Sequence, residues 1–427
     1  MDRLKYILII SMCAITAYGQ ITLEQCQALA RENYPAIKQY GLIEQITDYS
    51  IANATKAYLP QVSFNVQATY QSDVASFPDQ MTALYEQIGI RMKGLNKDQY
   101  RVTLEVNQTI WDGGISKASQ DIARAEGDLS KQNLEVELYT LRDRINNLYF
   151  GILILSEQLA LNTLFQELLE SNLKTVNACV QNGIAMPSDV NVIQVELLSA
   201  AQQRTQIESV QEAYRNMLSV MTGQPINNTA TFVKPFPQSL ADGINNRPEL
   251  QLLNSQSEQF EAQKRALNAS VMPRIGLFAQ GFYGNPGLNL FKDMTENRWT
   301  WNYIAGVRFQ WNFGSYYTLK GNRQKLSLAQ QRVESQRETF LFNTDLVTIQ
   351  QRNAITKMNK VMADDAEIIR LRTSIRETSE AKYANGTITV SELLRDMIAE
   401  NQSIQTKAQH EIEWLKNMYD LNNTLNN

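Results

Sequence analysis

Residues 138–159 read LYTLRDRINNLYFGILILSEQL and lie in the middle of a proline-free helical pattern that runs from about Ile115 to Val180. Apolar residues recur there at alternating spacings of three and four, the repeat of a coiled-coil seam: Leu138, Leu141, Ile145, Leu148, Ile152, Leu155 and Leu159. At about 1.5 Å per residue, such a helix would be roughly 100 Å long. No compact globular domain can enclose it, so we expect partner helices along its whole length.

A second proline-free run of similar length extends from about Leu319 to Tyr383, and other landmarks also occur twice. Pro35 and Pro248 are separated by 213 positions, and so are Pro60 and Pro273. Two further pairs follow in the same order, Trp111-Asp112 with Trp311-Asn312 and Asn182-Gly183 with Asn385-Gly386. The order predicts two internal repeats, residues 20–246 and 247–427, each running helix, strand, loop, strand, long helix, turn, helix.

Four segments alternate between apolar and polar residues, as amphipathic strands do: 61–70, 100–111, 274–283 and 299–311. Each has about the length that a tilted strand needs to cross an outer membrane, and aromatic residues stand near the strand ends. The alternative is a soluble antiparallel sheet packed on a core. The first two strands are joined by roughly thirty residues, which suggests an external or functional loop.

Four strands cannot close a barrel, and lipid offers no partner to an open strand edge, so a membrane barrel would have to be shared between chains. Two copies would give about eight strands and an interior filled by side chains, whereas three would give about twelve and leave a passage. The polar strand faces suit a wet interior and favour a trimer; they include Ser63, Asn65, Glu105, Asn107 and Arg308. The shorter helices expected at 37–59 and 188–221 together match the length of one long helix, so each repeat could add one continuous and one interrupted helix to a hollow helical cylinder.

The first 19 residues carry Arg3 and Lys5 before a short apolar run and predict a secretory signal peptide. After cleavage only Cys26 and Cys179 remain, and both are expected to be unpaired. The remaining chain has no stretch of 18 or more consecutive apolar residues, so the sequence predicts that no helix spans a membrane. The net charge of -4 gives no support to nucleic-acid binding.

Nothing in the sequence favours an enzyme. The lone histidine, His410, has no second histidine or nearby cysteine with which to bind a metal or form a catalytic site, so we expect a surface or packing role. No metal, cofactor or catalytic residue is therefore predicted.

Several short motifs occur along the chain in a fixed order: Thr22-Leu23-Glu24, Leu59-Pro60, Trp111-Asp112-Gly113-Gly114, Leu218 to Gly223, Asn246-Arg247-Pro248-Glu249 and Met272-Pro273. In these motifs and their order the chain resembles the TolC-like outer-membrane efflux proteins. The resemblance implies a mainly α-helical chain with membrane β-strands, a homotrimer with a twelve-stranded barrel in outer-membrane lipid of a Gram-negative bacterium, and a long α-helical barrel in the periplasm. It further implies a passive export duct that works with a periplasmic adaptor and an inner-membrane RND or ABC pump, in tripartite efflux or type I secretion. The alternative is a non-transporting envelope protein, a coiled-coil stalk with a structural or adhesive role.

The resemblance also implies a closure at the periplasmic tip, where the family pattern has a tyrosine, a glycine, an arginine and two aspartates. Tyr383, Gly386 and Glu392 fall on the tyrosine, glycine and first aspartate positions, whereas Ile388 and Arg395 depart from the pattern. We expect a constriction formed by Tyr383, Glu392, Arg395 and Asp189. Glu392 and Arg395 could form an ion pair or could be ordinary solvated residues.

Two further groups of residues are expected to carry function. The tip turns would contact the adaptor through Asn182, Gly183, Ser188, Asn385, Gly386 and Ser391. The barrel lumen would be lined by Asn65, Glu105, Asn107 and Arg308.

Overall fold

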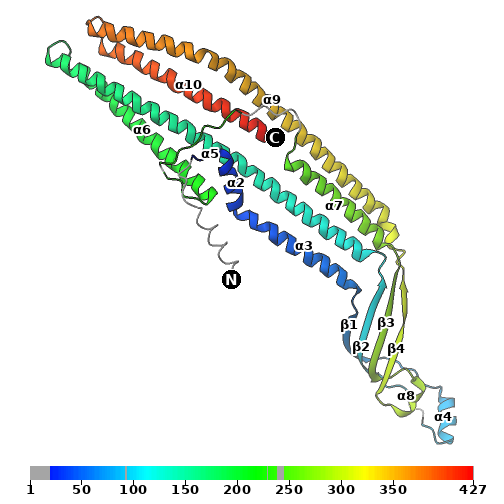
Figure 1. Cartoon of the computed structure of the whole chain (residues 1–427). Coiled ribbons are helices and arrows are strands. Elements are labelled where there is room, and N and C mark those ends of the chain that lie inside the picture. Colours follow the sequence, from blue (N-terminus) through cyan, green and yellow to red (C-terminus); the bar gives the residue numbers. More distant parts are fainter. Residues whose placement is uncertain (1–19, 92–93, 228, 238–244, 427) are drawn as a thin grey trace, which may run out of the picture. The chain divides into compact units, whose positions relative to one another are not determined.

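The computed structural model describes residues 20–91, 94–227, 229–237 and 245–426, so the expected signal peptide lies outside the described residues. The chain is mainly helical, with one four-stranded sheet (Figure 1). The helices are α2 (Leu23–Asn33), α3 (Gln39–Thr55), α4 (Asp79–Gln87), α5 (Ile115–Gln181), α6 (Pro187–Thr222), α7 (Pro248–Ser270), α8 (Leu290–Glu296), α9 (Ser315–Ala384) and α10 (Val390–Leu425), with 3-10 turns η1 (Pro35–Lys38) and η2 (Lys56–Tyr58). The strands are β1 (Gln61–Tyr70), β2 (Asp98–Trp111), β3 (Arg274–Asn285) and β4 (Thr300–Gln310).

These elements form two units. The first contains residues 1–40, 132–252 and 336–427, and the second contains residues 41–131 and 253–335. The sheet lies in the second unit, together with α4, α8 and most of α3 and α7. The long helices α5 and α9 contribute residues to both units.

The sheet is an antiparallel meander in the order β1-β2-β3-β4. The predicted strands are confirmed, and their ends differ from the prediction by a few residues at most. The loop between β1 and β2 contains the short helix α4, and the loop between β3 and β4 contains the short helix α8; neither helix was predicted. Local capping explains α8, because the Asn289 side chain accepts a hydrogen bond from the Lys292 backbone N–H at its first turn.

The core of the first unit is built on the predicted seam of α5. Ile145 and Ile152 are completely buried, together with Tyr149 and Phe150, against residues of α2, α6 and α10. The Tyr149 hydroxyl lies 2.7 Å from the carbonyl oxygens of both Ile21 and Val233, which satisfies its polar end inside the core. The seam therefore faces neighbouring helices, as its periodicity predicts.

By length and composition α5 could cross a membrane, contrary to the expectation from the sequence. A stretch of 18 residues within it has a mean hydropathy of 1.4, and a third of that stretch is buried within the chain. Since Tyr149, Phe150 and Ile152 of this helix pack in the core, we attribute its apolar character to helix packing.

Candidate functional site

The strand register places the four predicted lumen residues on one face of the sheet. Asn65 of β1 pairs with Thr103 of β2. Glu105 and Asn107 follow Thr103 on β2 by two and four positions, so they lie on the same face as Asn65. Through β3 the same face continues to the even-numbered residues of β4, including Arg308. Because successive strand residues point to opposite faces, these side chains share one polar surface.

Three of the four residues are joined by direct contacts. The Asn107 amide donates to Glu105 Oε1 at 3.0 Å, and the Arg308 guanidinium donates to Asn107 Oδ1 at 3.3 Å. Arg308 also lies 3.8 Å from the Glu105 carboxylate. The two phenylalanines on this face are covered by cations, since Arg308 stacks 4.8 Å from the Phe278 ring centroid and Arg101 stacks 4.5 Å from that of Phe282.

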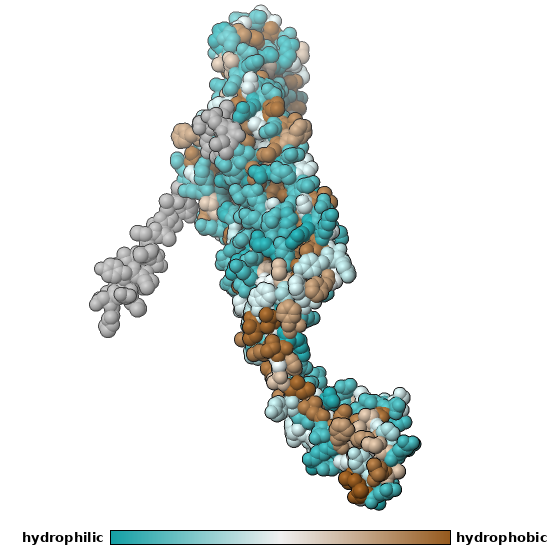
Figure 2. Space-filling view, turned by 90° about the vertical axis from the view of Figure 1, so that its right-hand side faces the viewer, coloured by the Kyte–Doolittle hydropathy of each residue, from teal (hydrophilic) through white to brown (hydrophobic). Residues whose placement is uncertain are grey.

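The opposite face of the sheet is mostly apolar, and Figure 2 shows apolar surface over this part of the molecule. Trp301 and Tyr303 of β4 are 79% and 82% exposed, so the described part of the chain leaves them uncovered. The face contains Val62, Phe64, Val66, Ala68, Tyr70, Tyr100, Val102, Leu104, Val106, Ile110, Ile275, Leu277, Ala279, Tyr283, Trp301, Tyr303, Ala305, Val307 and Phe309. A sheet with one polar and one exposed apolar face has the pattern of a membrane barrel segment.

Aromatic residues gather at both ends of the sheet. At the end near α4 and α8, Tyr100 stacks on Trp299 with ring centroids 5.9 Å apart, and Tyr283 lies 4.9 Å from Trp301. At the other end, the Trp311 and Phe313 rings are 4.7 Å apart. Such girdles flank the apolar band of membrane barrels.

The turn from β2 into α5 is organised by Asp112. Its carboxylate accepts hydrogen bonds from the backbone N–H groups of Gly114 at 2.8 Å and Ser116 at 2.7 Å, and from the Tyr58 hydroxyl at 2.8 Å. Burial by itself would raise the pKa of Asp112, but the hydrogen bonds from Ser116, Tyr58 and Gly114 prevail and lower it to about 2. Asp112 therefore acts as an ionised cap at the start of the long helix.

The two helix-tip turns have closely similar geometry. Gly183 and Gly386 adopt φ values of 72° and 69°, in the left-handed region that glycine tolerates. The preceding Asn182 and Asn385 each donate a side-chain hydrogen bond to a carbonyl in the last helical turn, at 2.9 and 2.8 Å. All six predicted adaptor-contact residues are exposed, including Ser188 and Ser391 just inside α6 and α10.

Two of the predicted constriction residues serve as helix caps. The Glu392 carboxylate accepts the Thr389 backbone N–H at 2.9 Å, while the Thr389 hydroxyl accepts the Glu392 N–H at 3.3 Å, which completes a capping box. These bonds from Thr389 lower the pKa of Glu392. Asp189 accepts the Met186 backbone N–H at 2.9 Å at the same position of α6.

The other two constriction residues differ in their surroundings. Arg395 is 73% exposed, and within one chain its closest carboxylate is that of Asp396, at 3.7 Å, rather than that of Glu392. Tyr383 packs against the cluster of α5, α6 and α10 residues behind the tips, and burial raises its pKa, helped by nearby Cys179 and Asp189. Its buried hydroxyl has no hydrogen-bond partner among the described residues.

An ion-pair cluster behind the tip was not predicted. The Arg376 side chain, 17% exposed, donates to Glu400 Oε2 at 2.5 Å and to Glu380 Oε1 at 2.6 Å, linking α9 to α10. The Ser379 hydroxyl donates to Asp396 Oδ2 at 2.7 Å and adds a second link between the same helices. The spacing of four between Arg376 and Glu380 could have revealed their pairing, but only the fold places Glu400 beside them.

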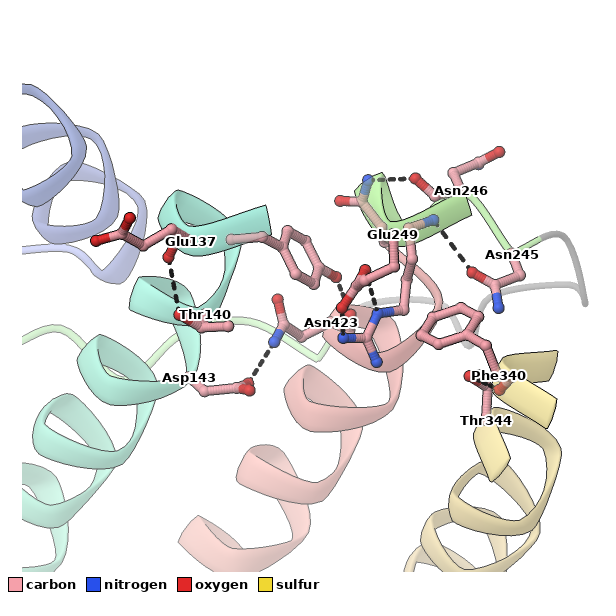
Figure 3. Close-up of polar contacts among 12 residues, drawn as sticks. Glu137, Thr140, Asp143, Asn245, Asn246, Glu249, Phe340, Thr344 and Asn423 are labelled. Carbon is pink, nitrogen blue, oxygen red and sulfur yellow. Dashed lines mark hydrogen bonds and ion pairs between the residues drawn. The ribbon is translucent and has the colours of Figure 1, made fainter. Parts of the chain in front are cut away.

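A second unpredicted cluster surrounds Arg247, just before α7 begins. Figure 3 shows Asn245, Glu249 and Phe340 of this cluster. The Arg247 guanidinium lies 5.4 Å from the Tyr139 ring centroid and 5.1 Å from that of Phe340, and it pairs with Glu249. The Arg247 backbone N–H donates to Asn245 Oδ1 at 3.1 Å. One side chain thus holds α5, α7 and α9 together, which gives the quoted Arg247-Pro248-Glu249 motif a structural role.

Metal binding finds no support among the described residues, since no group of three or more His, Cys, Asp and Glu side chains there could hold an ion. His410 packs between helices, with Nδ1 2.9 Å from the Asp365 carboxylate.

Comparisons with known proteins agree with this geometry. Residues 28–224 match the model of the family described as "Outer membrane efflux protein". A comparison with curated protein sequences finds no match.

Solved structures of outer-membrane channels share the fold. The Vibrio cholerae outer membrane protein VceC is 13% identical with a TM-score of 0.67, over 94% of this chain and 95% of that one. The Campylobacter jejuni CmeC channel is 14% identical with a TM-score of 0.65, over 94% and 85%. The Neisseria gonorrhoeae MtrE channel is 17% identical with a TM-score of 0.65, over 94% and 88%. The chain is therefore similar to the outer membrane efflux protein family over residues 28–224, and it shares the fold of outer-membrane channels over 94% of its length.

Proposed function

We propose that three copies of this chain close a twelve-stranded barrel in the outer membrane, which continues into a helical barrel in the periplasm and forms a passive export duct. The observation that carries this proposal is the four-stranded sheet with one polar face, one exposed apolar face and two unpaired edges. Lipid cannot satisfy the backbone groups of an open edge, so β4 of one copy would pair with β1 of the next. Twelve strands leave a passage lined by the polar face.

The dimensions of the apolar face support a membrane position. Tyr100 and Trp111 are the aromatic residues near the two ends of β2. Eleven steps of about 3.4 Å make about 37 Å along the strand, and a tilt of about 40° reduces this to about 28 Å. A barrel's apolar band is about 25 Å tall, so the strand has the required span.

The helical barrel would be built from two repeats in each chain, residues 20–246 and 247–427. Each repeat would supply one long helix and one interrupted helix. In this arrangement the tip turns at Asn182-Gly183 and Asn385-Gly386 point away from the membrane and would contact a periplasmic adaptor, which in turn would recruit an RND or ABC pump for tripartite efflux or type I secretion. Tyr383, Glu392, Arg395 and Asp189 would line the narrowest ring near these turns. No step of this function requires a cofactor or catalysis by the chain itself.

Single-channel recording in planar bilayers tests the proposal. Purified protein should run as a heat-sensitive trimer on native-like gels and should produce discrete conductance steps. A stable trimer without current would favour the stalk alternative, and a monomer that stays soluble without detergent would refute the shared barrel.

A further inference from the structure

Two loop helices at one end of the sheet expose apolar side chains. Met81 and Leu84 of α4 and the C-cap residue Ile88 lie on one side of this helix and are 41%, 57% and 66% exposed. Leu290 and Phe291, at the start of α8, are 42% and 68% exposed. Figure 2 shows apolar surface at this end of the sheet as well as over the strands. A clustered apolar patch on polar loops marks an interaction surface.

The α8 loop is firmly attached to the sheet. The Asp293 carboxylate is buried and accepts the Gly287 backbone N–H at 2.7 Å, and Asn302 of β4 accepts the Leu288 N–H at 3.1 Å. Asn285 and Asn297 close the loop through a side-chain hydrogen bond of 2.8 Å. The apolar side chains of α8 are therefore presented from a defined backbone.

The α4 loop is joined to the α8 loop by aromatic contacts. The Phe77 ring lies 6.0 Å from Tyr85 of α4 and 5.8 Å from Phe291 of α8. A backbone hydrogen bond from Leu95 to Ala75, at 3.1 Å, ties the two ends of the α4 loop together. The two loops thus form one cap on each sheet, and Leu84 and Ile88 stay more than half exposed on the side of α4 that also carries Tyr85.

The topology indicates what covers this patch. The loop of α4 follows β1 and the loop of α8 precedes β4, and these are the two strands with open edges. Tyr70 at the end of β1 and Thr300 at the start of β4 lie at the same end of the sheet, as the register shows. Pairing β4 of one copy with β1 of the next therefore brings the α8 loop of one copy beside the α4 loop of its neighbour.

We propose that the α4–α8 cap binds a second copy of this chain: the Leu84 and Ile88 face of α4 contacts Leu290 and Phe291 of the adjacent copy, so that three caps form a ring around the outer mouth of the duct. This inference rests on the proposed trimeric barrel. It adds an apolar contact between copies outside the strands and a second narrow point at the exit.

Cysteine cross-linking between two co-expressed chains tests the ring. Both chains carry Cys26→Ala and Cys179→Ser; one also carries Leu84→Cys and the other Phe291→Cys, so only a contact between copies can join them. A short thiol cross-linker should produce a covalent dimer within the trimer. The matched control is Glu86→Cys, on the opposite face of α4, which should give no dimer with Phe291→Cys.

The outcomes separate this inference from the proposed function. An intact, conducting trimer without the covalent dimer overturns the ring and leaves the duct. A second result would also overturn the ring: Leu84→Cys reacts with a lipid-soluble maleimide and forms no covalent dimer. That result would assign the patch to the membrane surface. Absence of any trimer overturns both. As a second readout, Leu84→Ser with Ile88→Ser should raise the conductance of intact trimers, and unchanged conductance would contradict a narrow point at the cap.

Discussion

Ala305 offers a sharp test of which sheet face meets lipid. It lies near the middle of β4, between the aromatic residues at the two strand ends, and faces Ala279, which in turn faces Val106. An arginine at the bilayer midplane of a barrel costs about 2–4 kcal/mol. Ala305→Arg would place one such charge in each copy, so the trimer should lose about 6–12 kcal/mol.

The adjacent residue provides a matched control. Ile304 belongs to the same strand but to the polar face, where it pairs with Gln280, and Gln280 pairs with Glu105. Ile304→Arg would place the guanidinium in the wet interior near a carboxylate. Its effect should stay within about 0.5 kcal/mol, as for an ordinary surface substitution.

Both variants can be refolded into phosphatidylcholine vesicles and unfolded with urea, with the heat-sensitive trimer band as readout. Even about 2 kcal/mol shifts a folding equilibrium by roughly thirtyfold, so the two variants should separate clearly. Equal losses in both variants, or a larger loss in Ile304→Arg, would refute the assignment of the apolar face to lipid.

Three further predictions concern the helices. Hydrogen bonding lowers the pKa of Asp112 from near 4 to about 2, so the ionised carboxylate should stabilise the fold by about 2 kcal/mol at neutral pH. This stabilisation should be lost as the pH falls from about 4 to 2. Asp112→Asn should remove this pH dependence from acid-unfolding curves. Arg376→Met should destabilise the α9–α10 hairpin by about 3–5 kcal/mol because it leaves Glu400 buried and unpaired. Limited proteolysis should show this loss, and adding Glu400→Met should restore much of the protease resistance. A double variant as labile as the single one would contradict this reasoning. Thr389→Ala should cost about 0.5–2 kcal/mol and speed amide exchange in the first turn of α10, and unchanged exchange would exclude the capping role.

Much of the sheet could be predicted because the strand period is two. The alternation of Val62, Phe64 and Val66 with polar residues gave both the strand and its exposed face, and the structure confirms them. Helix lengths were also predictable, since the absence of proline and the regular apolar seam left α5 uninterrupted. The α4 and α8 helices were missed because they are too short for periodicity to identify.

Residues at the tip show where sequence reasoning falls short. Thr389 and Glu392 stand three apart, as in a capping box, and this local signal explains the Glu392 contacts more simply than an ion pair with Arg395 does. In contrast, the partnership of Arg376 with Glu400 joins positions 24 residues apart. No local pattern encodes such a contact, since it depends on the register between α9 and α10.

The exposed apolar face also bears on the environment in which the sheet folds. Twelve large apolar side chains on this face are at least about 40% exposed in the single chain, among them Phe64, Leu104 and Val307. At roughly 1.5–3 kcal/mol for full burial of each, and half of that for partial exposure, leaving them in water forgoes about 9–18 kcal/mol of stabilisation. A whole domain is usually stable by only about 5–15 kcal/mol. If the proposed barrel forms, we expect folding of the sheet to be coupled to entry into lipid and to pairing of its edges with neighbouring copies.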